Sequence, residues 1–141
     1  MIRAIDLSKY IVSKCVSDNQ PISNLQLQKI LYYIQKDYLK RNEKAFSDDI
    51  EAWQFGPVVP NVYYYYCGYG AMPITFSCED YEEIDEKNKN IINKIVEEKR
   101  KLDPWVMVDE THKKDGAWDK TYKEGKGNHN VISTDLIKEE E

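Results

Sequence analysis

The sequence of 141 residues has no long hydrophobic run, only three cysteines and only two histidines. No apolar stretch approaches the roughly 20 residues that a membrane-spanning helix needs. The N-terminus also lacks the basic and then apolar pattern of a signal peptide. An odd number of cysteines without a CxxC pair argues against a disulfide framework. We therefore expect a single domain over residues 1–141, located in the cytoplasm and without a membrane partner.

Residues that carry enzyme chemistry are equally scarce. Neither His112 nor His129 has a Cys, His or Asp partner at a spacing typical of a zinc site. His112 and Asp115 form the one candidate pair of a base and its orienting group, but such pairs are common on protein surfaces. The glycines at 125–127 do not continue as a dinucleotide-binding motif, and no serine nucleophile elbow is present. The sequence therefore predicts no catalytic residue, no cofactor and no metal site, and it does not indicate an enzyme.

The net charge of −5 is unevenly distributed along the chain. Residues 1–45 contain eight Lys/Arg and four Asp/Glu, whereas residues 46–98 contain three Lys/Arg and eleven Asp/Glu. The acidic middle argues against a broad phosphate-binding face and would suit a basic protein partner. The basic start leaves an alternative open, a nucleic-acid-binding regulator that uses its first two helices. Because the second helix does not begin with a cluster of base-reading arginines, we favour a protein partner over nucleic acid.

Apolar residues at helical spacing predict that most of the chain is helical. A first helix is expected over 4–16. A second begins after Ser23, which forms a capping box with Gln26, and its wide apolar stripe predicts that it is the central core helix. Further helices are expected over 84–102, after Asp103, around 118–122 and after Ser133.

Two details of the C-terminal third are also predicted. Trp105 and Val108 are expected to form the buried face of the short helix that follows Asp103. The three glutamates at 139–141 place negative charge at a helix C-terminus, which is unfavourable, so we expect this end to fray.

The segment from Ile50 to Tyr66 contains the least ordinary pattern of the chain. Residues 50–55 alternate apolar and polar side chains, which predicts a strand that is covered on both faces. Gly56 and Pro57 are expected to end strand pairing, because proline has no N–H to donate. Pro60 then suits the first turn of a helix. The tyrosines at 63–66 are spread around that helix at about 100° per residue, so one or two of them should be exposed.

Aromatic residues are concentrated near this segment. The chain has eleven Tyr, three Trp and three Phe, and they are densest between positions 53 and 69. Exposed aromatic side chains are enriched at protein interfaces, so the predicted partner-binding residues are Trp53, Phe55, Tyr64, Tyr65 and Tyr69. The alternative is that these rings belong to the core and its boundary. The expected fold is mainly α (α+β), with five to six helices and a small two- or three-stranded β-sheet.

Two runs of sequence resemble a known family. The runs L-x-L-Q-K-I-L-Y-Y at 25–33 and I-E-A-W-x-F-G-P-V-V-P-x-V-Y at 50–63 resemble the Panacea antitoxin domain, a SocA-like family often described as phage-associated. Three later stretches fit the family as well, namely 102–108, Trp118 and 131–133. The resemblance therefore covers nearly the whole chain.

This resemblance implies a mostly helical domain with a small sheet. It also implies the antitoxin of a toxin–antitoxin pair, which neutralises a cognate toxin by direct protein–protein binding. One mechanism that it implies is that of a proteolytic adaptor, which delivers the toxin to the Clp protease. It identifies no particular toxin and brings no catalytic residues. The residues that match its signature, from Trp53 to Tyr63, would serve the fold as well as an interface.

Overall fold

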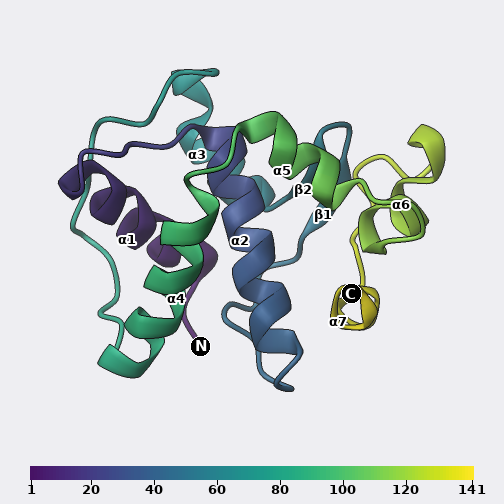
Figure 1. Cartoon of the computed structure of the whole chain (residues 1–141), viewed down its shortest axis with the longest axis horizontal. Coiled ribbons are helices and arrows are strands. Elements are labelled where there is room, and N and C mark those ends of the chain that lie inside the picture. Colours follow the sequence, from purple (N-terminus) through teal and green to yellow (C-terminus); the bar gives the residue numbers. More distant parts are fainter.

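Helix α2 (Asn24–Leu39) runs through the middle of the molecule, with the other elements arranged around it (Figure 1). The structure is a computed structural model that describes residues 1–141. The predicted capping box is present, because the side chain of Ser23 accepts a hydrogen bond from the Gln26 N–H and the Gln26 side chain accepts one from Ser23 N–H. α2 contacts α1, α3, α4, α5, α7 and β2. It is therefore the central core helix, as predicted.

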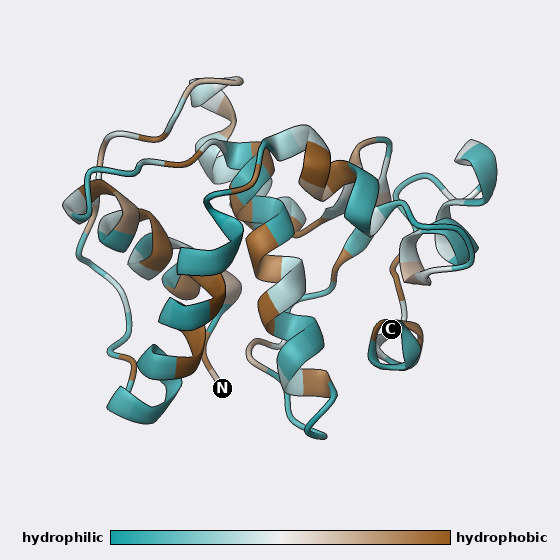
Figure 2. Cartoon of the chain, in the orientation of Figure 1, coloured by the Kyte–Doolittle hydropathy of each residue, from teal (hydrophilic) through white to brown (hydrophobic).

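Two helices cover one side of α2. They are α1 (Ala4–Ser17) and α4 (Glu86–Lys99), and Figure 2 shows both as amphipathic, with brown apolar residues and hydrophilic outer turns. α4 begins where Asp85 accepts a hydrogen bond from the Asn88 N–H at 2.8 Å. Both helices form close to their predicted ranges. Cys15 of α1 is fully buried and has a free thiol.

The strand predicted at 50–55 is the first arm of a hairpin. β1 (Glu51–Trp53) pairs antiparallel with β2 (Gly56–Val58), so the expectation that Gly56 and Pro57 end strand pairing is wrong. Pro57 lies opposite Ala52, and both backbone groups of Ala52 bond to the chain at 129–130 on the other side. The missing N–H of Pro57 therefore breaks no bond of this pair. A single bridge between Glu51 and Val131 adds a short third segment beside β1.

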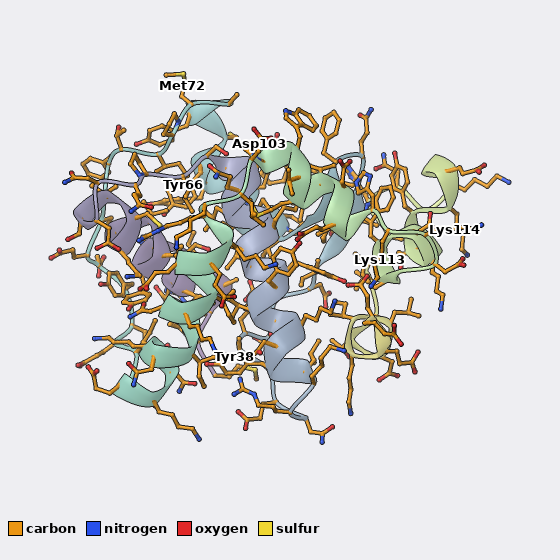
Figure 3. The ribbon with its side chains drawn as sticks, viewed as in Figure 1. Tyr38, Tyr66, Met72, Asp103, Lys113 and Lys114 are labelled. Carbon is orange, nitrogen blue, oxygen red and sulfur yellow. The ribbon has the colours of Figure 1, made fainter.

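Helix α3 (Pro60–Tyr66) follows the hairpin and continues into a 3₁₀ turn, η1 (Cys67–Tyr69). Tyr64 and Tyr65 are 60% and 54% exposed, whereas Tyr66 is buried, which confirms that one or two of the four tyrosines face outward. Residues 70–85 contain no helix or strand. Met72 lies at the outer end of this segment and is 69% exposed (Figure 3).

The C-terminal third consists of short helices. Asp103 caps α5 (Pro104–Thr111) by accepting a hydrogen bond from the Trp105 N–H, and Ser133 caps α7 (Thr134–Glu139) in the same way from Leu136. Between them lie α6 (Ala117–Tyr122) and the 3₁₀ turn η2 (Lys123–Gly125). Lys113 and Lys114 occupy the link between α5 and α6 (Figure 3).

The buried face of α5 differs from the prediction. Val108 is buried as expected, but its neighbour in the core is Met107, and Trp105 is 56% exposed. The helix begins at Pro104 as predicted, but Trp105 lies in its first turn beside the hairpin, where its ring meets Phe55 instead of the core.

The prediction that the C-terminus frays is wrong. The Glu140 side chain is 3% exposed and forms an ion pair of 2.9 Å with Lys36. It also accepts hydrogen bonds from the Tyr32 hydroxyl at 2.8 Å and from the Ala117 N–H at 2.9 Å. The unfavourable charge at the end of α7 is therefore compensated by α2 and by the uncapped N-terminus of α6.

Seven α-helices and one small antiparallel sheet form a single compact domain. This confirms the predicted mainly α (α+β) class. None of the helices has both the length and the apolar character that a membrane crossing requires.

Candidate functional site: an aromatic cavity beside the first half of α2

A cavity of about 460 Å³ lies between the first half of α2, the β1–β2 hairpin, α3 and η1, and the start of α5. Ligand pockets in proteins usually measure about 300–1,000 Å³. Five of its lining residues carry rings, and three more are polar or charged residues of α2 that are buried; the eight are Trp53, Phe55, Tyr63, Trp105, His129, Asn24, Gln28 and Lys29.

Two other hollows are larger, at about 600 and 520 Å³. The first lies at the N-terminus, and its lining includes Glu43, Glu82 and Glu83. The second surrounds the ion pair of Lys36 and Glu140, where the charged groups already bind one another. The smaller cavity is the better candidate, because only there do aromatic walls meet a buried charge without an acidic partner.

Trp53 is the centre of an aromatic cluster. Its ring stacks on His129 at 4.4 Å between ring centroids and contacts Tyr63 at 5.0 Å and Tyr64 at 5.8 Å. The indole N–H donates to the carboxylate of Glu51 at 2.9 Å. Since Trp53 is only half-buried and lies outside the main core, it orders this surface and does not close the core.

The mouth of the cavity is formed by Phe55 and Trp105. The two rings meet edge to face at 5.4 Å, and their side chains are 48% and 56% exposed. Large aromatic side chains in this state keep apolar area available to a partner.

The predicted partner-binding residues divide into two groups. Trp53, Phe55 and Tyr64 come together at the hairpin and α3, as described above. Tyr65 instead contacts Tyr66 at 4.8 Å, with the Lys9 ammonium 5.4 Å from its ring centroid. Tyr69 is half-buried and packs against the core. The structure therefore places three of the five side chains on one surface, named the hairpin surface below, and two outside it.

Two buried amides hold the floor of the cavity in place. Gln28 accepts a hydrogen bond from the Val59 N–H at 2.9 Å and donates to Asn24 at 3.0 Å. Asn24 in turn donates to the carbonyl oxygen of Tyr63 at 3.0 Å. These bonds tie α2 to the start and middle of α3, so the walls of the cavity are fixed relative to its floor.

Lys29 is the one charged group of the floor, and it is fully buried. Its ammonium donates to the carbonyl oxygen of Pro57 at 3.1 Å and has no carboxylate within ion-pair distance. Burial lowers the pKa of Lys29 to about 7. Gly56 makes room for it: a Cβ there would lie 2.9 Å from the ammonium nitrogen, and its φ of +116° also favours glycine.

His112 does not bond to Asp115, its partner in the one candidate pair of a base and its orienting group that the sequence indicated. Its ring stacks on Trp118 at 3.6 Å, and burial together with the charge of Lys29 lowers the pKa of His112. The N–H of Asp115 donates to Asp119 instead. His112 therefore has a packing role in the structure.

Sequence reasoning missed Lys29, Trp105 and His129 as members of the site. Lys29 follows Gln28 in a helix of mixed composition, and a lysine at such a position is normally solvated. One signal was available, since Lys29 lies between the apolar positions Leu27 and Ile30 in a helix that was expected to be central.

Comparison with known proteins identifies the class of protein. The family described as "Antitoxin SocA-like, Panacea domain" matches residues 27–119, so the chain belongs to this family of antitoxin domains, and the resemblance seen in the sequence is confirmed. The chain is also similar to the Antitoxin SocA of Caulobacter vibrioides (strain NA1000 / CB15N), with 38% identity over 58 residues. That stretch is 40% of this chain and 31% of the relative, so the match spans about a third of that protein. No solved structure matches the chain.

Proposed function

We propose that this protein is an antitoxin that neutralises a cognate toxin by direct protein–protein binding through the hairpin surface. The observation that carries this proposal is the cluster of exposed and half-exposed rings around Trp53, Phe55 and Tyr64 in a member of an antitoxin family. Aromatic side chains that are held by their neighbours lose little conformational freedom on binding, so they make effective interface anchors.

Charge supports a basic surface on the toxin. The hairpin surface belongs to the segment 46–66, which contains three acidic residues and no Lys or Arg. Asp49 is exposed just before β1, and Glu51 is bonded to the indole of Trp53. A positively charged partner would be attracted to this region, and complementary charge speeds association.

The alternative of a nucleic-acid-binding regulator has less support. The basic side chains of α1 and α2 are largely engaged within the protein: Lys14 pairs with Asp18 and Glu97, Lys36 pairs with Glu140, and Lys29 is buried. Phosphate binding needs basic groups that are free to replace counterions. We therefore keep protein binding as the proposed activity, in the cytoplasm and without catalysis.

Direct binding allows two fates for the toxin, occlusion or delivery to a protease such as Clp. Co-expression with the adjacent open reading frame separates them, scored by growth, by pulldown and by the amount of the partner. Growth rescue with a stable complex supports occlusion, and rescue with loss of the partner supports delivery. Absence of both toxicity and a complex for the adjacent product would contradict the proposed function.

A further inference from the structure

The lining of the aromatic cavity contains no acidic residue, which is unusual for this chain. The protein has 25 Asp and Glu residues and a net charge of −5, yet none of the 15 residues that line the cavity is acidic. Its titratable basic groups are Lys29 on the floor and His129 on the wall. The lining of the cavity therefore has no carboxylate of its own, although Glu51 bonds to the indole N–H of the wall residue Trp53.

The ammonium group of Lys29 does not use all of its hydrogen-bond donors there. A lysine ammonium has three donors, and its one hydrogen bond is to the carbonyl oxygen of Pro57. A buried cation without an anionic partner is strongly unfavourable. Because Lys29 is 0% exposed, an anion reaches this ammonium only when the side chain or the residues that cover it shift. The charge-assisted bond would then form in a site shielded from water, where such bonds are strongest.

The backbone adds to this preference for anions. Asn24, Leu25 and Gln28 of the lining belong to the first two turns of α2. The N-terminal end of a 16-residue helix carries partial positive charge. The helix dipole and the lysine therefore favour the same sign of ligand.

The aromatic walls of the cavity favour a planar ligand. Trp53, Phe55, Tyr63, Trp105 and His129 offer ring faces and edges around the cavity, and planar rings bind such surfaces by stacking or edge contacts. At about 460 Å³ the cavity exceeds the size of one side chain and lies in the range of small-molecule sites.

We propose that this cavity binds a small planar ring compound that carries an anionic group, with the anion directed to Lys29 and the ring held between the aromatic walls. The anion is a phosphate or a carboxylate. This inference goes beyond the proposed antitoxin function, because the ligand is a small molecule and its binding is measured on the isolated protein without any toxin.

Isothermal titration calorimetry on the full chain tests the proposal with two matched pairs of probes. AMP is compared with adenosine, which lacks the phosphate, and indole-3-acetate with indole-3-acetamide, which lacks the charge. In at least one pair, the anion should bind about ten- to hundredfold more tightly than its neutral match, as expected for one charge-assisted hydrogen bond. A preference in the first pair alone identifies phosphate, and one in the second alone identifies carboxylate.

Two variants locate the binding. Lys29→Met keeps the length of the side chain and should remove the preference for the anion, while Lys94→Met, a change at an exposed lysine of α4, should leave it intact. Trp105→Ala alters an exposed residue at the mouth, so the fold should be retained. It should weaken both members of the pair at least threefold and preserve the preference for the anion.

Four results would overturn the proposal. The first is that neither anion binds at millimolar concentration, and the second is that anion and neutral match bind equally in both pairs. The third is that Trp105→Ala changes neither affinity, and the fourth is that the preference for the anion survives in a folded Lys29→Met variant.

Discussion

The two halves of α2 differ in whether a buried charge has a partner of opposite charge. In the second half, Lys36 and Tyr32 bind Glu140, which also receives the Ala117 N–H, so the carboxylate has three partners. Burial opposes ionisation of Glu140, but these hydrogen bonds and the charge of Lys36 outweigh it, and its pKa is lowered. In the first half, Lys29 has one carbonyl partner and no counter-charge.

We interpret the Glu140 site as structural and propose that the Lys29 site is functional. The paired carboxylate of Glu140 joins α2, α6 and α7, and Lys36 balances its charge within the protein, although a hollow of about 520 Å³ surrounds the pair. The unpaired Lys29 brings no comparable gain in stability, and it is one of the residues that line the aromatic cavity. Functional sites commonly retain such unfavourable groups, so we expect substitutions at the two ends of α2 to have opposite consequences.

The largest effect is expected at Glu140. Glu140→Ala should lower the free energy of unfolding by about 3 kcal/mol, because it leaves Lys36 without its buried counter-charge. Urea denaturation measures this change. Glu139→Ala is the matched control, since Glu139 is exposed, and it should stay within about 0.5 kcal/mol of the wild type. Equal effects of the two substitutions would show that the C-terminus is not held by Glu140.

Lys29→Met should change stability in the other direction, raising the free energy of unfolding by about 1–4 kcal/mol near neutral pH. The pKa of Lys29 is about 7 in the folded protein, below its ordinary 10.5, so the unfolded chain binds more protons between these values. Wild-type stability therefore gains from this group as the pH rises from 7 toward 10. The advantage of Lys29→Met should be greatest near pH 7 and shrink toward pH 10.

Denaturation of both proteins at several pH values checks this prediction. His112 is the titratable group whose pKa responds to Lys29, and its own pKa is lowered, so it stays neutral across this window. Lys94→Met provides the control for loss of a lysine. Destabilisation by Lys29→Met at every pH would mean that the bond to Pro57 matters more than the burial of the charge.

Tyr64→Ala should weaken the toxin complex about tenfold. Tyr64 is 60% exposed and contacts the Trp53 ring, so its removal takes away interface area while the core is unaffected. The loss of stability should stay below about 1 kcal/mol. Surface plasmon resonance with the cognate toxin measures the affinity, and thermal unfolding measures the stability. Normal affinity would remove Tyr64 from the interface.

Tyr65→Ala should have the smallest effect, less than about threefold on affinity. Tyr65 is the neighbouring exposed tyrosine, at 54%, but its ring lies beside Lys9 of α1. The two substitutions remove the same side chain from adjacent positions of one helix. If Tyr65→Ala weakens binding as much as Tyr64→Ala, the interface extends over α1 and is not centred on the hairpin.

Local signals in the sequence were sufficient for much of the fold. The capping box of Ser23, the caps at Asp103 and Ser133, and the proline at the start of α3 depend on residues within one helical turn. Such features can be predicted because tertiary contacts rarely override them. The spread of tyrosines on α3 was predictable for the same reason, since it follows from helix geometry alone.

The site was harder to predict, because its members are defined by distant contacts. Pro57 pairs in a strand because Ala52 bonds to residues 129–130, far along the chain. Trp105 joins Phe55 through the placement of α5, and Glu140 is buried only because Lys36 and Ala117 reach it. Composition and periodicity do not predict these pairings.

Hydrogen–deuterium exchange of the protein, free and bound to its toxin, tests most directly whether the hairpin surface is the functional one. We predict new protection over 51–66, which includes β1, β2 and α3, with little change over 134–141. Protection at 134–141 and around Lys36 without protection of the hairpin would contradict the account, because the end of α2 that carries the Lys36–Glu140 pair would then be the interface.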